Sequence, residues 1–213
     1  MNNKPSTNQP RRCSAFIATG SQTKTGEIVM GHTTHTDIVS AALFNIILYM
    51  TPEKGIPFTM QTAPGCIASG TDWFLTKKGF IGCETTIGDV NYRPVFNKTH
   101  HPYFCRIRNA MQYATSLKQY ADIMTKNNAG DYACSWLFGD TNTNEIMLCE
   151  LGLDIKNIQT TKDGIFYGMN SAMSSALRTC ETDDQEFTDM RTSSGARNAR
   201  LLQLFAKYSG QIT

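Results

Sequence analysis

The chain has 213 residues and a formal net charge of +2 at pH 7, with 40% hydrophobic and 18% charged residues. A chain of this length can bury a sizeable core, and we expect one domain over residues 13–213. Lysine and arginine are scattered and form no basic run, so the charge pattern gives no support for binding to nucleic acid or to an anionic membrane.

Residues 1–12, MNNKPSTNQPRR, are polar and contain two prolines. This composition predicts a disordered tail or the remnant of a propeptide. The segment lacks the apolar core of a secretory signal, and the sequence leaves the compartment open.

Seven cysteines are present, an odd number, so at least one has no intramolecular disulfide partner. No CxxC pair occurs, which argues against a zinc site or a thioredoxin-like motif. Several cysteines lie in apolar runs such as GFIGCETTI and EIMLCELGL, where a reduced cysteine packs as a small hydrophobic side chain. The pattern suits a reducing compartment.

Two short apolar runs at residues 13–19 and 27–31 flank the connector GSQTKTG. Glycine, serine and threonine favour turns, so the two runs are predicted to form a β-hairpin. His32 and His35 follow directly, at the end of the second strand.

The longest apolar stretch, IVSAALFNIILYM at residues 38–50, fits either a strand or a helix. Its 13 residues are too few to span a bilayer, so no integral membrane segment is predicted. We expect this stretch to lie in the core or to line a cleft as an amphipathic segment. Residues 61–89 then have the rhythm of strand, turn and strand, with TKKG as the tight turn and Phe80–Ile87 as the second strand.

Residues 103–130 carry apolar side chains at steps of three and four, which predicts helix. A break is expected at Thr115 and Ser116, where Ser116 can cap the second helix. Gly130 is expected to end that helix.

Two strands joined by TNTN are predicted at residues 132–140 and 145–153, and a later strand ends at Asn170. A polar loop and a final helix over roughly residues 190–208 follow. Because the strands come in hairpins and the helices in a block, the pattern favours an α+β fold with antiparallel sheet over βαβ units.

No P-loop, GxSxG, GxGxxG or metal-binding motif is present. The candidates for chemistry are polar residues at the ends of predicted strands, together with one on the last helix: Cys13, His32, Asp72, Asn170 and Arg197. Each also has an ordinary structural interpretation. Cys13 could be an inert thiol and His32 a loop histidine. Asp72 could cap a turn, Asn170 could cap the N-terminus of a helix, and Arg197 could be a solvated charge on a helix.

In combination these residues could support nucleophilic catalysis. A cysteine attacks as a thiolate and needs a base or a positive charge nearby. If Cys13 became the first residue, its own α-amine, with a reference pKa of roughly 8, would supply that base. The Asn170 amide could stabilise an oxyanion, a contribution of roughly 3–4 kcal/mol. Arg197 could hold the thiolate charge or orient a carboxylate.

Six segments stand in chain order between residue 13 and about residue 206: CSAFIATG, MGHTTHTD, IASGTDWFLTKKGFIGCETTIG, NNAGDYACSWLFGD, YGMNSA and SSGARNARLLQLF. Together they resemble the N-terminal nucleophile (Ntn) hydrolases with a cysteine nucleophile. The resemblance is greatest to phospholipase B-like proteins and to acyl-CoA:6-aminopenicillanate acyltransferase-like proteins of bacteria. The stretch that ends in ETTIG is the most specific match.

This resemblance implies a four-layer αββα sandwich with two antiparallel sheets between helix layers. It implies self-cleavage before Cys13, with the Cys13 thiol as nucleophile, the new α-amine as base and His32 beside them. Asn170 would help to form the oxyanion hole, Asp72 would line the site and Arg197 would support the charge network. The reaction would hydrolyse or transfer an acyl group from a linear amide or ester through a thioester. The substrate would be a small molecule or a lipid, and no metal or cofactor is expected.

The chain also departs from the family pattern. Thr33 and His35 stand where relatives usually carry Asn and Trp, and Arg12 stands where the acyltransferases have Gly. Thr76 stands where penicillin acylase-type relatives have an Asn that helps the oxyanion hole. These differences leave a second function open, a binding or structural protein that keeps the fold without catalysis. The oligomeric state is left open as well.

Overall fold

The computed structural model describes residues 13–91 and 99–213, and the expectation for residues 1–12 lies outside them. The strands are β1 (Ser14–Thr19), β2 (Val29–Thr33), β3 (Ile46–Met50), β4 (Phe58–Thr62), β5 (Trp73–Thr76), β6 (Phe80–Thr86), β7 (Cys134–Asp140), β8 (Glu145–Leu151), β9 (Lys156–Thr161) and β10 (Gly164–Gly168). The helices are α1 (Ile38–Leu43), α2 (Tyr103–Tyr113), α3 (Leu117–Thr125), α4 (Ser175–Glu181) and α5 (Ser193–Tyr208), with a short 3-10 turn at Gly20–Gln22.

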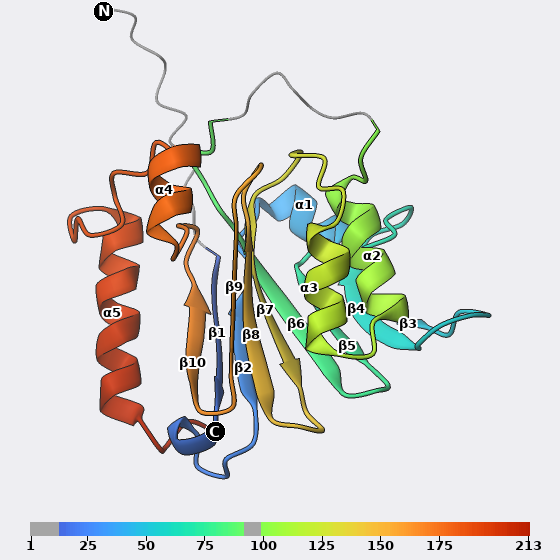
Figure 1. Cartoon of the computed structure of the whole chain (residues 1–213), viewed down its shortest axis with the longest axis horizontal. Helices are drawn as coiled ribbons and strands as arrows, with labels where there is room; N and C mark the ends of the chain where they lie inside the picture. Colours follow the sequence, from blue (N-terminus) through green and yellow to red (C-terminus); the bar gives the residue numbers. More distant parts are fainter. Residues whose placement is uncertain (1–12, 92–98) are drawn as a thin grey trace, which may run out of the picture.

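The strands form two antiparallel sheets that face each other. The smaller sheet has the order β10-β1-β2, and the larger sheet runs in chain order from β3 to β9. The expected hairpins β1–β2, β5–β6 and β7–β8 are all present. In Figure 1, α4 and α5 cover the outer side of the smaller sheet, and α2 and α3 cover the outer side of the larger one. The expected αββα sandwich is confirmed.

The helices on the larger sheet are divided where the sequence predicts a break. The Ser116 side chain caps α3 by accepting a backbone N–H at 3.2 Å. The helix ends at Thr125, because Asn127 adopts the left-handed conformation, with φ of 51°. Helix α3 therefore ends before Gly130, the residue at which the sequence predicted its end.

The main core lies between the larger sheet and the α2–α3 layer and is built around aromatic rings. Trp136 and Phe138 stack with ring centres 5.1 Å apart, and Phe74 stacks on Tyr120 at 5.8 Å. Gly82 leaves room for this packing, since a Cβ at that position would lie 2.4 Å from the Phe74 ring. A second, smaller core between the two sheets contains Ala15, Ile17, Cys83, Leu137, Ile146 and Leu148.

The two sheets differ in width, and this difference leaves part of the larger sheet uncovered. The smaller sheet packs mainly on β6, β7 and β8, and its edge strand β2 faces β4 and β5 only across a cavity. Apolar side chains on that inner face, including Tyr49 and Leu75, therefore remain exposed.

The stretch at residues 38–50 combines both structures that its sequence allows, because it forms α1 and then β3. The expectation that it lies in the core holds only for Leu48 and Met50, which pack against the main core, whereas Ile38, Val39 and Tyr49 are exposed. The alternative expectation holds, because Ala41 and Phe44 line a cleft.

The segment after Asn170 was expected to be a polar loop, but it contains α4. The Ser174 side chain caps this helix, and the Glu181 carboxylate at its end accepts the backbone N–H groups of residues 153–155 at 2.6–2.9 Å. The hydrophobic pattern of neighbouring residues cannot predict such a contact, because it joins α4 to a loop that is distant in the sequence. The sequence analysis also did not predict β9.

The cysteines are free thiols, and those in apolar runs are buried, as expected: Cys83, Cys134 and Cys149. Within residues 13–91 and 99–213, no helix is long and apolar enough to cross a membrane.

The Tyr120 hydroxyl offers a test of this core. Tyr120 is fully buried, and its hydroxyl has no hydrogen-bond partner among the described residues. Replacing it in Tyr120→Phe removes an unsatisfied polar group without changing the packing, so the free energy of unfolding should rise by about 1 kcal/mol in urea titrations. The matched variant Tyr132→Phe removes a hydroxyl that bonds Glu84 at 3.1 Å and should lose about 1–3 kcal/mol. A loss of stability in Tyr120→Phe would contradict the packing described here.

Candidate active site

Cys13 lies directly before β1, with its side chain buried to 9% exposure. Side chains alternate along a strand, and Ala15 and Ile17 belong to the core between the sheets, so Cys13 is on the same inner side. Its sulfur accepts the backbone N–H of His35 at 3.5 Å. The loop after β2 therefore closes over the thiol.

Arg197 joins the last helix to the first strand and to the end of β10. One guanidinium nitrogen, Nη1, donates to the main-chain oxygen of Cys13 at 2.6 Å and to the Asn170 Oδ1 at 3.2 Å. The interpretation of Arg197 as a solvated charge is thus wrong. Because a guanidinium can only donate, the oxygen of the Asn170 amide must face Arg197 and its nitrogen must face away. The contact fixes the orientation of the amide.

Main-chain groups of the segment Glu84–Gly88 hold two of the candidate side chains. His32 Nε2 donates to the Glu84 oxygen at 2.8 Å, and Asn170 Nδ2 donates to the Thr86 oxygen at 2.8 Å. The Gly88 N–H in turn donates to the main-chain oxygen of Asn170 at 3.1 Å. The ETTIG stretch is therefore the backbone frame to which His32 and Asn170 are attached.

Asp72 and Asn170 share an uncommon backbone conformation. Both are left-handed, with φ of 62° and 72°. Asp and Asn tolerate this region better than other residues with a side chain, and such conformations cluster at functional sites. Asn170 is not a helix N-cap, because Ser174 has that role for α4.

Two carboxyl groups, those of Asp72 and Glu84, lie close to each other. The Glu84 side chain is completely buried. Its Oε1 accepts a hydrogen bond from the Tyr132 hydroxyl at 3.1 Å. No N–H or hydroxyl group of the described residues donates to its Oε2. Its remaining neighbour is the Asp72 carboxyl, which is close enough for a side-chain hydrogen bond. Since an ionised carboxylate cannot donate, a hydrogen bond between the two carboxyl groups requires a proton on one of them.

The electrostatics of the pair agree with a shared proton. Burial raises the pKa of Asp72 to about 7, and the hydrogen bond to Glu84 opposes this rise. Burial, and then the negative charge of Asp72, raise the pKa of Glu84 well above its usual value; the Cys13 thiolate form acts on it in the same direction. The pair therefore keeps a proton up to about neutral pH.

His32 is a neutral imidazole with a defined tautomer. Its Nε2 carries the hydrogen, because a carbonyl oxygen such as that of Glu84 only accepts. Its Nδ1 lies 3.5 Å from the Thr34 hydroxyl, whose single hydrogen goes to the main-chain oxygen of Thr71 at 2.8 Å. Burial lowers the pKa of His32, although the bond to Glu84 opposes this. The ring therefore keeps a lone pair on Nδ1, on the side of Thr34.

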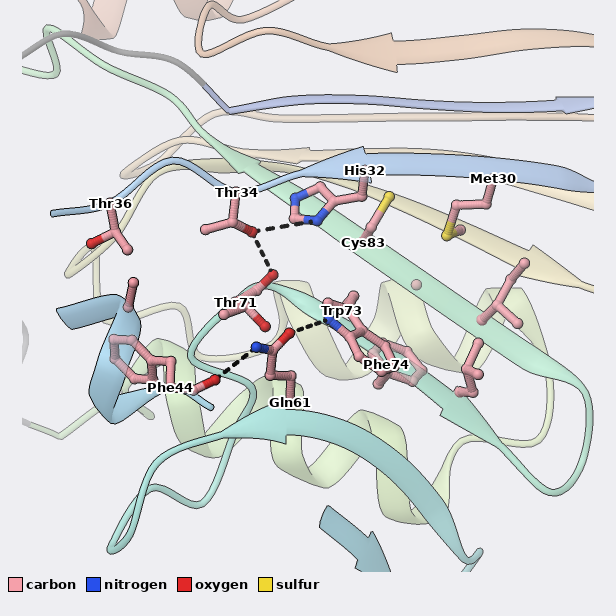
Figure 2. Close-up of a pocket in the computed structure, with 14 residues that line it drawn as sticks. Met30, His32, Thr34, Thr36, Phe44, Gln61, Thr71, Trp73, Phe74 and Cys83 are labelled. Atoms are coloured by element: carbon pink, nitrogen blue, oxygen red, sulfur yellow. Dashed lines mark hydrogen bonds between the residues drawn. The ribbon is translucent and has the colours of Figure 1, made fainter. Parts of the chain in front are cut away.

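A cavity of about 670 Å³ opens beside His32 (Figure 2). It lies between β2 on one side and α1, β4 and β5 on the other, over the uncovered face of the larger sheet. Gln61 is held inside it, since its Nε2 donates to the Phe44 oxygen at 2.7 Å and its Oε1 accepts the Trp73 indole N–H at 3.3 Å. No Asp, Glu, Lys or Arg stands among the described residues that line the cavity.

The structure places Cys13, His32, Asp72, Asn170 and Arg197 in one connected group. Thr76 is not part of it, because it lies at the far end of β5, roughly 13 Å along the strand from Asp72, and caps the turn by accepting the Phe80 N–H at 3.0 Å. Thr76 therefore supplies no oxyanion donor to this group, in line with the absence of the asparagine that relatives carry at this position.

The sequence analysis missed Glu84 and Tyr132. A glutamate in the middle of the apolar run FIGCETTI was the available signal for Glu84. Tyr132 carried no such signal, because only its contact with Glu84 distinguishes it. Within the described parts of the chain, no group of three or more His, Cys, Asp or Glu side chains is placed to hold a metal ion.

The raised pKa of Asp72 predicts the direction of a pH effect on stability. Between about pH 4 and 7 the folded protein holds a proton that the unfolded chain has released, so the free energy of unfolding should fall as the pH rises through this window. Asn fits the left-handed backbone and needs no proton, so Asp72→Asn should be more stable than the original protein by about 2 kcal/mol at pH 8 and nearly equal to it at pH 4. Urea titrations at both pH values measure this.

Asp163 provides a control of opposite sign. Two hydrogen bonds from Ser21 lower the pKa of this exposed carboxylate. Asp163→Asn should therefore lose stability at pH 8 rather than gain it. Parallel pH profiles for the original protein and Asp72→Asn would contradict the buried carboxyl pair.

Two curated relatives carry the name of the family that the sequence resembles. The putative phospholipase B-like 2 of Mus musculus is 32% identical over 91 residues, which are 40% of this chain and 15% of the mouse protein. The Rattus norvegicus protein of the same name is 35% identical over 82 residues, 36% of this chain and 14% of that protein. The matched segments are thus a small part of these relatives. A mutant conjugated bile acid hydrolase from Clostridium perfringens is structurally similar, with a TM-score of 0.46 and 11% identity over 78% of this chain and 55% of that one.

The strongest comparison is with a whole family. The family model for Phospholipase B matches residues 1–167 out of 213, which is more than three quarters of the chain and includes Cys13, His32, Asp72 and Glu84. The protein belongs to the phospholipase B family.

Proposed function

We propose that this protein is a self-processing cysteine hydrolase or acyltransferase that acts on linear amide or ester acyl groups, with Cys13 as its nucleophile. The observation that carries the proposal is the contact of Arg197 with both the Cys13 carbonyl and the Asn170 amide. It brings a thiol and an oriented amide together from three distant parts of the chain. Membership of the phospholipase B family supports the general class, acyl transfer to water or to another acceptor.

Processing would expose the base. The Cys13 thiol attacks the carbonyl carbon of Arg12, the peptide C–N bond breaks, and the thiol proton passes to the released nitrogen. Water then hydrolyses the thioester and frees residues 1–12. Cys13 is left with an α-amine whose reference pKa of roughly 8 allows it to accept a proton near neutral pH.

Catalysis would repeat this chemistry on the substrate. The α-amine takes the thiol proton, the thiolate forms a bond with the acyl carbon, and the carbonyl oxygen becomes negative. Asn170 Nδ2 uses one hydrogen on the Thr86 oxygen and has a second hydrogen for this oxyanion, and the His35 N–H is a second donor beside the sulfur. The ammonium then protonates the leaving amine or alcohol, and water releases the acid from the thioester.

Cys13→Ala tests both steps. Intact mass should show the original protein shortened by residues 1–12 and Cys13→Ala at full length, and hydrolysis of a water-soluble acyl ester should fall to background in the variant. Cys180→Ala, which removes an exposed free thiol, is the matched control and should be processed and active. Acyl hydrolysis retained in Cys13→Ala would end the proposal. A full-length mass for active original protein would end the α-amine mechanism.

Asn170→Gly isolates the amide from the backbone. Glycine accepts the left-handed conformation of this position, so the fold should be kept while the amide donor is lost. We expect kcat to fall by about 10²–10³-fold. The urea midpoint should fall as well, because the Thr86 oxygen and Arg197 each lose a hydrogen bond, so kcat is measured under conditions where circular dichroism shows the variant to be folded. An unchanged kcat would remove Asn170 from the oxyanion hole.

A further inference from the structure

Gln61 lies in the middle of β4, and its side chain faces the cavity. Side chains alternate along a strand, and the neighbouring Met60 belongs to the main core on the outer face, so Gln61 points to the inner face. It is the one amide side chain among the described residues that line the cavity. Its chemistry therefore sets what this part of the cavity can bind.

Two hydrogen bonds fix the orientation of the Gln61 amide (Figure 2). Its Nε2 donates to the main-chain oxygen of Phe44 at 2.7 Å, and its Oε1 accepts the indole N–H of Trp73 at 3.3 Å. A carbonyl oxygen only accepts and an indole N–H only donates, so the nitrogen and the oxygen of the amide cannot exchange places. A primary amide has two hydrogens and two lone pairs. The contacts with described residues leave one N–H and one lone pair of Gln61 free.

The cavity begins beside the nucleophile rather than at it. Thr34 and Thr36 line the cavity, and His35, which lies between them in the chain, donates its N–H to the Cys13 sulfur. Cys13 itself is not among the described residues that line the cavity. A substrate that reacts at Cys13 can therefore extend past this loop toward Gln61, with the reacting bond outside the cavity.

We infer that Gln61 is a specificity-determining residue that binds an uncharged amide group of the substrate, separate from the bond that is cleaved. The inference rests on the proposed function, to which it adds a recognition group that the substrate carries. A carboxamide or a peptide unit offers an acceptor for the free N–H of Gln61 and a donor for its free lone pair. An ester or a ketone offers the acceptor alone.

The rest of the cavity selects an uncharged ligand with an apolar body. No Asp, Glu, Lys or Arg stands among the described lining residues, and burial keeps the His32 imidazole neutral by lowering its pKa. A charged ligand would lose water here without gaining an opposite charge. A ligand without polar groups would displace water from Gln61 and leave its N–H and its lone pair unsatisfied. Phe44 and Trp73, which hold the amide, also line the cavity and offer aromatic surface to an apolar body.

NMR titrations of full-length Cys13→Ala, in which turnover is excluded, test the inference with small probes of one shape. Phenylacetamide carries a donor and an acceptor, phenylacetone carries the acceptor alone, and phenylacetate carries a charge. The chain has two tryptophans, and the indole N–H of Trp73 reports on the site because it bonds Gln61. The indole of Trp136, in the main core on the outer face, is the internal reference. Phenylacetamide should bind about tenfold more tightly than either of the other probes.

Gln61→Met, made in the same background, removes the amide and keeps the length of the side chain. It should bind phenylacetamide and phenylacetone equally. The variant also loses the contacts with Phe44 and Trp73, but partial unfolding weakens the binding of both probes alike, so the ratio of the two affinities isolates the amide. Gln159→Met is the matched control, since Gln159 is exposed on β9 at the opposite edge of the same sheet. It should keep the tenfold preference.

The outcomes that contradict the inference are equally specific. Phenylacetamide could leave the Trp73 signal unchanged, or Cys13→Ala could bind the amide no more tightly than the ketone or the carboxylate. Either result would remove amide recognition from the cavity. A preference for the amide that persists in Gln61→Met would show that another group recognises it, and Gln61 would then have only a structural role.

This inference and the proposed function fail in different ways. Amide-selective binding by Cys13→Ala, together with no hydrolysis of a water-soluble ester by the original protein, would overturn the proposed function and leave Gln61 as a ligand-binding residue. Cys13-dependent hydrolysis of that ester without any preference for the amide probe would overturn the role of Gln61 alone.

Discussion

The site depends on the main-chain groups of one short segment, Glu84–Gly88. Its carbonyl oxygens bind the His32 imidazole and the Asn170 amide, and its last N–H binds the backbone of Asn170. Because backbone positions in a sheet are set by pairing with β7, these side chains inherit the rigidity of the larger sheet. Arg197 then fixes the orientation of the Asn170 amide, because it donates to the amide oxygen and so keeps the amide nitrogen on the other side. The arrangement holds the amide in place before any substrate arrives.

The same segment also lowers the stability of the folded protein, because it carries a buried carboxyl group, that of Glu84. The side chain of Glu84 is buried beside that of Asp72, where water cannot stabilise the charge. The pair avoids two charges by keeping a proton, and the Tyr132 hydroxyl satisfies one of its oxygens. An acidic proton is thereby held in the interior, on the segment whose main chain binds His32 and Asn170. Perturbed titrations of this kind are characteristic of working sites.

Much of the fold could be predicted from local patterns, and much of the site could not. Alternating apolar residues and turn residues predicted the hairpins, and Ser116 predicted the start of α3, because both depend on neighbours in the chain. The candidate residues could be named from their types and order, but their proximity comes from contacts across as many as 184 residues, as between Arg197 and Cys13. The exposure of residues 38–50 was missed for a related reason: it follows from the narrow second sheet, which no local pattern encodes.

Because the two sheets differ in width, the two faces of the larger sheet have different roles. On its outer face, Met60 and Phe138 belong to the aromatic core beneath α2 and α3. On its inner face, Gln61 and Leu75 line a cavity whose other side is formed by Met30 and His32 of β2. Since neighbouring positions along a strand serve different faces, the cavity can change its shape through substitutions that leave the core intact.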